Sequence, residues 1–206
     1  MDNGESSYRR FLLGDEAALD EILERYRLHL IFFIDRIVHD PDTAEDIAID
    51  VFVYLLTHPR RYHFKVSLKT YLFMLGRSRA LDYLRRRKFL SPDPIPADQP
   101  DPWDLETQLL ADERNKALHA ALKTLPADMQ QALHLVYFEE LSYEQTAAVM
   151  KKSKKQVDNL LYRGKERLRA IVANTGLKHL AKIVNLFAVI KLISFHKKHL
   201  CRPQYS

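Results

Sequence analysis

The sequence contains little glycine and almost no cysteine. Five of its 206 residues are glycine, and they stand alone at Gly4, Gly14, Gly76, Gly164 and Gly176. Neither a P-loop nor a dinucleotide-binding GxGxxG motif can be assembled from them, which excludes the commonest phosphate-cradling enzymes. The single cysteine, Cys201, excludes an internal disulfide framework and fits a reducing compartment.

The N-terminus also lacks a long apolar run. No such stretch follows the charges of the first ten residues, MDNGESSYRR, so we expect no secretory signal and a cytoplasmic location. Charged residues make up 29% of the chain and hydrophobic residues 47%, which is the balance of a globular protein. At roughly 150 residues per domain, this length predicts one domain or two small ones.

Charge is distributed unevenly along the chain. Residues 1–60 carry thirteen acidic and six basic side chains, whereas residues 61–88 carry nine basic side chains and one acid, Asp82. Residues 151–206 carry fourteen basic side chains and only Asp158 and Glu166 as acids. A single basic run is most often a solvated helix face, but two blocks that coincide with motifs indicate a polyanionic partner.

Every periodic segment of the chain has the spacing of a helix. Apolar residues at intervals of three and four predict a helix over 16–38. A second helix is expected to start at a cap on Asp42 or Thr43, to bury Phe52 in its apolar stripe and to end before Pro59. After a loop over 60–66, Ser67 is expected to cap a third helix with a mostly basic outer face. Because no strand pattern occurs, the predicted fold class is all-α.

A proline-rich segment divides the chain. Five of the nine prolines and four aspartates lie within 89–104, and proline both fixes φ and lacks the donor that a helix needs. We therefore predict an N-terminal domain over 1–88, an acidic linker over 89–104 and a second helical domain over 105–173. The extension over 174–206 is apolar and basic, and its role stays open between packing on a domain, lying at anionic lipid and masking or regulating DNA binding.

The second domain contains two helix-start signals in close succession. It begins with a predicted helix over 105–123, and Pro126 is expected in the first turn of the next helix. Ser142 with Gln145 forms a capping-box pattern, and Ser153 with Gln156 repeats it eleven residues later. Two helix starts at this distance predict a helix-turn-helix, and the cationic face of its second helix suits the major groove of DNA.

Three motifs in this order resemble an RNA polymerase sigma factor of the two-domain, extracytoplasmic-function type. Residues 42–55, DTAEDIAIDVFVYL, resemble the acidic helix of sigma domain two, DAEDLVQEVFLRLW. Residues 67–87 resemble the helix SFRAWLYRIARNLALDLLRRR that follows it, and residues 122–168 resemble sigma domain four. The chain departs from the family at Ile49 and Asp50, at Tyr71, at Ser78, and at Lys151 and Lys152, which replace Gly-Ile in the turn.

The resemblance implies a protein that binds core RNA polymerase and directs promoter-specific initiation. The implied polymerase-binding residues are Glu45, Asp46, Asp50, Phe52 and Tyr54, where Phe52 and Tyr54 would act as an apolar anchor. The implied contacts to the −10 element are Tyr62, His63, Phe64, Lys65, Tyr71, Arg77, Arg79, Arg85 and Arg86. The implied contacts to the −35 element are Ser153, Lys154, Lys155, Gln156, Asp158, Asn159, Tyr162, Arg163 and Lys165.

The same resemblance implies an anti-sigma partner, often membrane-bound, and no catalytic residue, cofactor or small-molecule substrate. An alternative is a helix-turn-helix regulator that binds DNA without core polymerase, although residues 1–88 show no ligand-binding or receiver pattern. A metal site at His196, His199 and Cys201 is disfavoured because no second ligand cluster accompanies it. The aromatic residues of the 62–65 loop are as consistent with local packing as with base capture.

Overall fold

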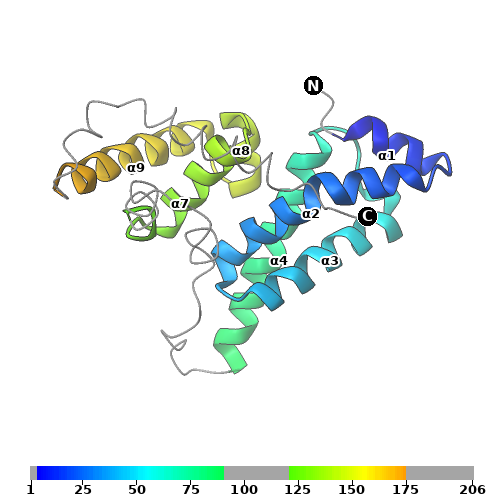
Figure 1. The fold of residues 1–206 in the computed structure, drawn as a ribbon, viewed down its shortest axis with the longest axis horizontal. Coiled ribbons are helices and arrows are strands. Elements are labelled where there is room, and N and C mark those ends of the chain that lie inside the picture. Colours follow the sequence, from blue (N-terminus) through cyan, green and yellow to red (C-terminus); the bar gives the residue numbers. More distant parts are fainter. Residues whose placement is uncertain (1–3, 91–120, 175–206) are drawn as a thin grey trace, which may run out of the picture.

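The computed structural model describes residues 4–90 and 121–174, and the regular structure in both ranges is entirely helical (Figure 1). The all-α prediction is confirmed. The predicted linker beyond Leu90, most of the predicted 105–123 helix and the 175–206 extension lie outside the described residues. Within the described ranges, no helix combines the length and apolarity that crossing a bilayer requires.

Four helices and a short turn form the N-terminal module: α1 (Glu5–Leu12), α2 (Ala17–Val38), α3 (Pro41–Thr57), the 3-10 turn η1 (Pro59–Arg61) and α4 (Leu68–Leu90). The central helix α2 contacts α1, α3 and α4. Its buried residues recur at intervals of three and four, as in Tyr26, Leu30, Phe33 and Ile37. Gly76 brings α4 close to α2, because a Cβ there would lie 2.8 Å from a methyl group of Leu30.

One predicted helix start of the N-terminal module, that of α3, lies at a different residue in the structure. Asp40, and not Asp42 or Thr43, caps α3: its carboxylate accepts a hydrogen bond from the Thr43 N–H at 3.2 Å. Pro41 then occupies the first helical position, where its missing N–H leaves no hydrogen bond unmade. Ser67 does cap α4, since its hydroxyl accepts from the Thr70 N–H at 3.2 Å. The short helix α1 was not predicted.

The C-terminal module comprises α7 (Ala127–Leu133), the π-helical turn η2 (His134–Phe138), α8 (Tyr143–Met150) and α9 (Lys154–Asn174). Pro126 lies just before α7 rather than in its first turn, because its ψ of 143° is extended. Both predicted capping boxes are present. The Gln145 and Gln156 N–H groups donate to the Ser142 and Ser153 hydroxyls, and both glutamine side chains accept from the serine N–H groups.

The first capping box yields a stability prediction. Replacing Ser142 with alanine removes an acceptor from the start of α8, and we expect the free energy of unfolding to fall by about 1 kcal/mol. Ser142→Asp retains an acceptor oxygen and serves as the matched control, with a loss of only a few tenths of a kcal/mol expected. Urea unfolding followed by circular dichroism measures both variants. Equal losses in the two variants would show that the cap hydroxyl is not the cause.

The two modules lie against each other (Figure 1), an arrangement that the sequence did not predict. Helix α4 contacts α8, and α2 contacts α7. The contact joins the two helix caps, because the Gln145 side-chain amide donates to the Ser67 hydroxyl at 3.4 Å. The cationic helix of the N-terminal module is therefore partly covered by the helix-turn-helix.

Candidate nucleic-acid interface

The turn between α8 and α9 is tight and unusually basic. Lys151 takes the left-handed conformation with φ 53°, where glycine is the usual residue. The Lys151 and Lys152 N–H groups donate to the carbonyls of Ala148 and Ala147, which closes the end of α8. The Lys152 ammonium pairs with Asp128 at 3.1 Å, so one turn lysine also ties α8 to α7.

Helix α9 separates its apolar and polar residues onto opposite faces. Val157, Leu161 and Leu168 are fully buried, and α9 packs on both α7 and α8. Of the predicted −35 contacts, Lys165 is half-buried and the other eight are exposed: Ser153, Lys154, Lys155, Gln156, Asp158, Asn159, Tyr162 and Arg163. The fold thus places eight of the nine on the outer side of α9, and Ser153 caps the start of this helix. That face combines cations with amide and aromatic groups, as a base-reading helix requires.

One cation of this face has an acidic neighbour. Lys154 pairs with Glu144 at 2.5 Å, and its ammonium lowers the pKa of that carboxyl to about 2. Both side chains are more than 60% exposed, so solvent weakens the pair. A DNA phosphate could therefore replace Glu144 as the partner of Lys154.

The predicted −10 loop is divided between surface and core. Tyr62 is only 3% exposed, and its hydroxyl donates to the Val66 carbonyl at 2.8 Å. Its ring packs on Tyr8, Phe64 and Tyr71. In this structure Tyr62 is therefore part of a buried aromatic cluster, and its contact with the −10 element stays a prediction.

Phe64 is the most unusual residue of this loop. It is half-buried with φ 57°, a conformation that is strained for a bulky side chain. The Arg9 guanidinium covers its ring at 3.9 Å from the centroid. His63 and Lys65 on either side are exposed. His63 and Lys65 are thus accessible at the surface, whereas the ring of Phe64 is partly covered by Arg9.

The predicted −10 contacts among the cations of α4 differ in exposure and in their partners. Arg85 and Arg86 are exposed near its C-terminal end, and Arg79 is half-buried between Asp50, at 3.6 Å, and the ring of Tyr54. Arg77 differs, because its Nε donates to the Gln131 side chain of the C-terminal module at 2.9 Å. Desolvation lowers the pKa of Arg77. Arg77 is therefore covered by the C-terminal module, and the half-buried Tyr71 belongs to the aromatic cluster.

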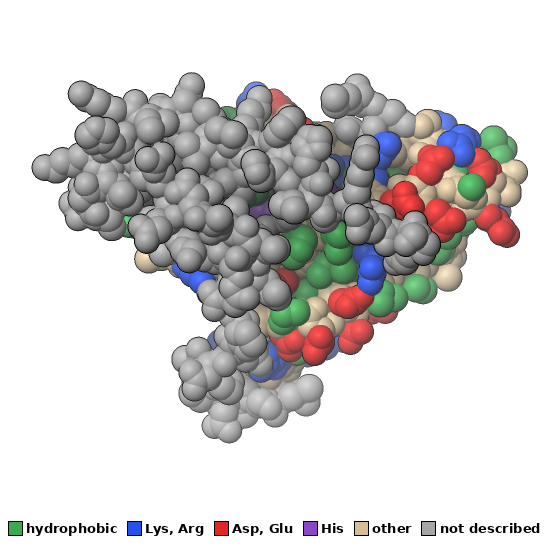
Figure 2. Space-filling model, viewed as in Figure 1, with side chains coloured by type: hydrophobic (Ala, Val, Ile, Leu, Met, Phe, Trp, Pro, Cys, Tyr) green, Lys and Arg blue, Asp and Glu red, His purple; other side chains and the backbone are tan. Residues whose placement is uncertain are grey.

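An acidic surface with apolar side chains runs along α3 (Figure 2). Asp46 and Asp50 are exposed, whereas Glu45 is half-buried and paired with Arg27 of α2. Phe52 is only 5% exposed and lies in the core, as its place in the apolar stripe predicted, so it is not on the surface of α3 in this structure. Half-buried Tyr54 stacks on His58.

Sequence reasoning missed the exposed apolar residues of α3. Ile49 and Val53 are 47% and 50% exposed and lie one helical turn apart, next to Asp46 and Asp50. The helical spacing could have identified them, because Val51, Phe52 and Leu55 already fill the buried face. We define Asp46, Ile49, Asp50 and Val53 as the α3 face.

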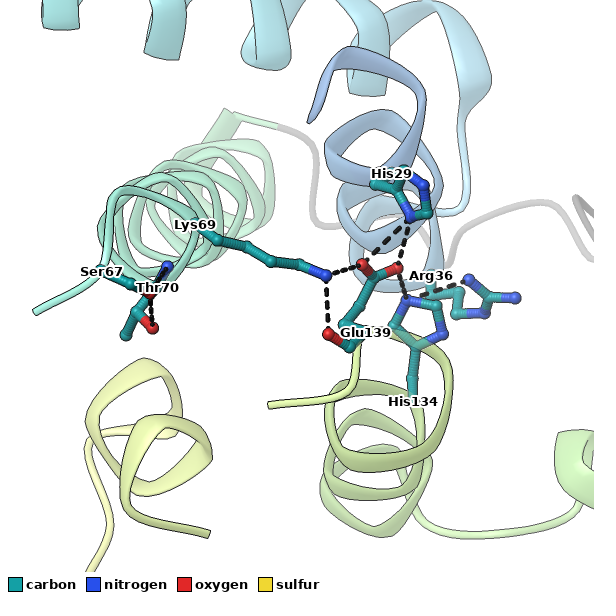
Figure 3. A network of polar contacts seen from close by, with 7 residues as sticks. All are labelled: His29, Arg36, Ser67, Lys69, Thr70, His134 and Glu139. Atoms are coloured by element: carbon teal, nitrogen blue, oxygen red, sulfur yellow. Dashed lines mark hydrogen bonds and ion pairs between the residues drawn. The ribbon is translucent and has the colours of Figure 1, made fainter. Parts of the chain in front are cut away.

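Sequence reasoning also missed a cluster of charged and polar residues around a buried carboxylate between the modules (Figure 3). Glu139, at the end of η2, is 3% exposed and accepts from the Lys69 ammonium at 3.0 Å. His29 and His134 lie 3.1 and 3.2 Å from its carboxylate. Burial alone would raise the pKa of Glu139, but hydrogen bonds from His134 and His29 outweigh burial and hold it well below the ordinary value. Glu139 is therefore an anion at neutral pH.

No group of three or more histidine, cysteine or carboxylate side chains that could hold a metal occurs within residues 4–90 and 121–174. His196, His199 and Cys201 lie outside these ranges.

Comparison with known proteins identifies one family whose two regions match the two helical modules. Residues 22–89 match the family Sigma-70 region 2, and residues 115–168 match Sigma-70, region 4. The chain is 28% identical to RNA polymerase sigma-H factor of Pseudomonas aeruginosa, covering 75% of this chain and 86% of that protein. It is also 28% identical to ECF RNA polymerase sigma factor SigM of Bacillus subtilis, covering 74% and 94%.

Two solved structures have a similar fold. One is sigma factor RpoE in complex with anti-sigma factor NepR from Bartonella quintana, with TM-score 0.57, 21% identity and coverage of 75% of this chain and 96% of that chain. The other is CnrH in complex with the cytosolic domain of CnrY, with TM-score 0.61, 16% identity and coverage of 84% and 99%. Because two regions of one family match in order on the two modules, this chain belongs to the sigma-70 family of RNA polymerase sigma factors, as a member of the extracytoplasmic-function type.

Proposed function

We propose that this sigma factor divides promoter-specific initiation among three surfaces: the α3 face for core RNA polymerase, the 63–65 loop with α4 for the −10 element, and α9 for the −35 element. The observation that carries the proposal is the outer face of α9, where seven exposed predicted contacts follow the capping residue Ser153. Such a face supplies both phosphate and base-edge contacts.

The α3 face has the composition of a protein-binding surface. Exposed Ile49 and Val53 provide an apolar centre, and Asp46 and Asp50 provide charge beside it. Apolar side chains that become desolvated at the centre of an interface supply most of the affinity, whereas charges at the rim steer the partner. The matching polymerase surface should therefore be basic around an apolar pocket.

The −10 element is proposed to meet His63, Phe64 and Lys65 of the loop together with Arg79, Arg85 and Arg86 of α4. Flipping a base costs a few kcal/mol, which stacking on an aromatic ring and a cationic groove for the backbone would offset. Phe64 is half-buried and therefore more accessible than the other six-membered ring of this loop, because Tyr62 is buried.

Reading both elements requires the modules to separate. The −10 and −35 elements lie about 25 base pairs apart, which is about 85 Å at 3.4 Å per base pair. In this structure the modules touch through the 3.4 Å hydrogen bond between Gln145 and Ser67. The conformation described is therefore a closed state, distinct from the promoter-bound one.

A protein inhibitor is proposed as a further partner, because both solved neighbours are described as complexes, one of them with an anti-sigma factor. No chemical reaction is assigned to the chain. It is proposed to act in the cytoplasm, where polymerase and promoter DNA are present.

Reconstitution with bacterial core polymerase tests the function directly. The holoenzyme should initiate at defined sites when transcript starts are mapped on genomic DNA, and core polymerase alone should not. A gel shift with and without core polymerase is the companion measurement. Promoter binding by the chain alone, with no initiation in the presence of core, would identify an independent DNA-binding regulator instead.

The reading helix yields its own prediction. Arg163→Ala and Lys155→Ala should each weaken promoter binding by the holoenzyme by about 1–3 kcal/mol. If Lys155 contacts a phosphate, its loss should also reduce the salt slope of binding by about one unit. Arg10→Ala is the matched control, because Arg10 is an exposed cation that pairs with Asp15 and Glu21 on another surface. Should all three variants bind alike, α9 is not the reading helix.

A further inference from the structure

Glu139 draws most of its partners from the other module. Of the three groups around its carboxylate, only His134 belongs to the C-terminal module, whereas Lys69 comes from α4 and His29 from α2 (Figure 3). The Lys69 ammonium also donates to the Glu139 backbone carbonyl at 2.6 Å. One lysine thus satisfies both a carboxylate and a carbonyl across the module boundary.

These contacts can stabilise only the closed state. A buried carboxylate is tolerated when cations and donors surround it, and it becomes costly when one of them is removed. Separation of the modules removes Lys69 and His29 from Glu139 and exposes the buried carboxylate to water. The buried apolar residues of the two modules form one continuous cluster, so the charged groups around Glu139 add to an apolar contact between the modules.

Three further side-chain contacts join the two modules. The ring of Phe33 stacks on His134 with centroids 5.9 Å apart, and the Arg36 guanidinium lies 3.5 Å from the same imidazole. Arg77 donates to Gln131. Two cations of α4, Lys69 and Arg77, are therefore occupied by groups of the helix-turn-helix module.

We infer that Glu139 is an intramolecular latch that holds this sigma factor closed and occupies the Lys69 ammonium in place of a DNA phosphate. The inference deepens the proposed function and rests on it for the role of α4 in DNA binding. The Glu139 carboxylate and a phosphate are both anionic oxygen acceptors for a lysine, so Lys69 serves one or the other. Closure by Glu139 and DNA binding through this part of α4 are therefore mutually exclusive.

The matched pair Glu139→Gln and Glu140→Gln tests the latch in the full chain. The two carboxylates are adjacent, but Glu140 is exposed whereas Glu139 is buried. Glutamine keeps the size of the side chain and removes the charge. We expect E139Q to show a larger radius of gyration in small-angle X-ray scattering than wild type, and E140Q to match wild type.

DNA binding without polymerase is the second readout. On a fluorescent duplex, at low salt, E139Q should bind at least about tenfold more tightly than wild type, because it exposes Lys69 and Arg77. E140Q removes the same formal charge and should produce only the small change expected from net charge. Equal gains in E139Q and E140Q would attribute the effect to net charge and overturn the latch.

A further, double variant covers the case in which E139Q does not fold. His29→Gln combined with Lys69→Met removes the two partners of Glu139 that come from the N-terminal module and leaves the C-terminal module unchanged in sequence. This double variant should also expand the chain. A folded E139Q or double variant that scatters like wild type overturns the proposal. Because scattering requires neither polymerase nor promoter, this result is separate from any failure of transcription in the reconstituted system.

Discussion

Ile49→Lys is expected to weaken binding to core RNA polymerase about a hundredfold or more. Ile49 is 47% exposed and lies on the α3 face between acidic side chains. Truncating a central interface residue commonly costs about 2 kcal/mol or more, and placing like charges opposite each other adds several kcal/mol. The lysine would introduce a positive charge where a basic partner surface is expected. Fluorescence anisotropy of the labelled sigma factor titrated with core polymerase measures the effect.

Leu13→Lys is the control for Ile49→Lys, because it places a lysine at an exposed apolar residue outside the α3 face. Leu13 is 88% exposed in the turn that follows α1 and is not part of the α3 face. Leu13→Lys should therefore bind core polymerase like wild type. Both variants should keep the helical circular dichroism of wild type, because neither residue is buried. If Ile49→Lys retained full affinity while folded, the polymerase would have to bind a different surface.

Phe33→Ala is expected to cause the largest loss of stability, about 3–5 kcal/mol in the free energy of unfolding. The Phe33 side chain is fully buried, and its ring lies 5.1 Å from that of Phe73 and 5.9 Å from that of His134. Truncation would leave a cavity where the core of α2 and α4 meets the C-terminal module. Urea unfolding of the full chain followed at 222 nm provides the measurement.

Phe32→Ala is the natural comparison, because it removes the same ring from the neighbouring position. Phe32 is half-buried rather than fully buried, so its loss creates less cavity and should cost clearly less. Similar losses in the two variants would mean that the environment of Phe33 is not the closely packed one described above.

The helices and their caps could be predicted because their signals are local. The apolar period of α2 and the two capping boxes each depend on residues within a few positions of one another, and the structure contains all of them. The cap of α3 was misplaced by two or three residues, because Asp40, Asp42 and Thr43 are all good capping residues. The choice among them followed from Pro41, whose fixed φ suits the first helical turn.

The contact between the modules could not be predicted, because its partners are distant in the sequence. Lys69 and Glu139 are separated by 70 residues, and His29 and Glu139 by 110. Nothing in the local pattern distinguishes Lys69 or Arg77 from the other cations of α4. Similarly, the sequence identified an aromatic loop but did not establish that Tyr62 would be buried by Tyr8 and Tyr71.

The stacking of Arg9 on Phe64 has a consequence for how the loop would choose its ligand. A guanidinium and a nucleobase both prefer the face of an aromatic ring, and in this structure the guanidinium already occupies that position. A base that stacks on this face must displace the guanidinium. The preference among bases would therefore depend on the difference in free energy between the Arg9–Phe64 stack and the base–Phe64 stack. Arg9 of α1 would then compete with every incoming base for the same face of the Phe64 ring.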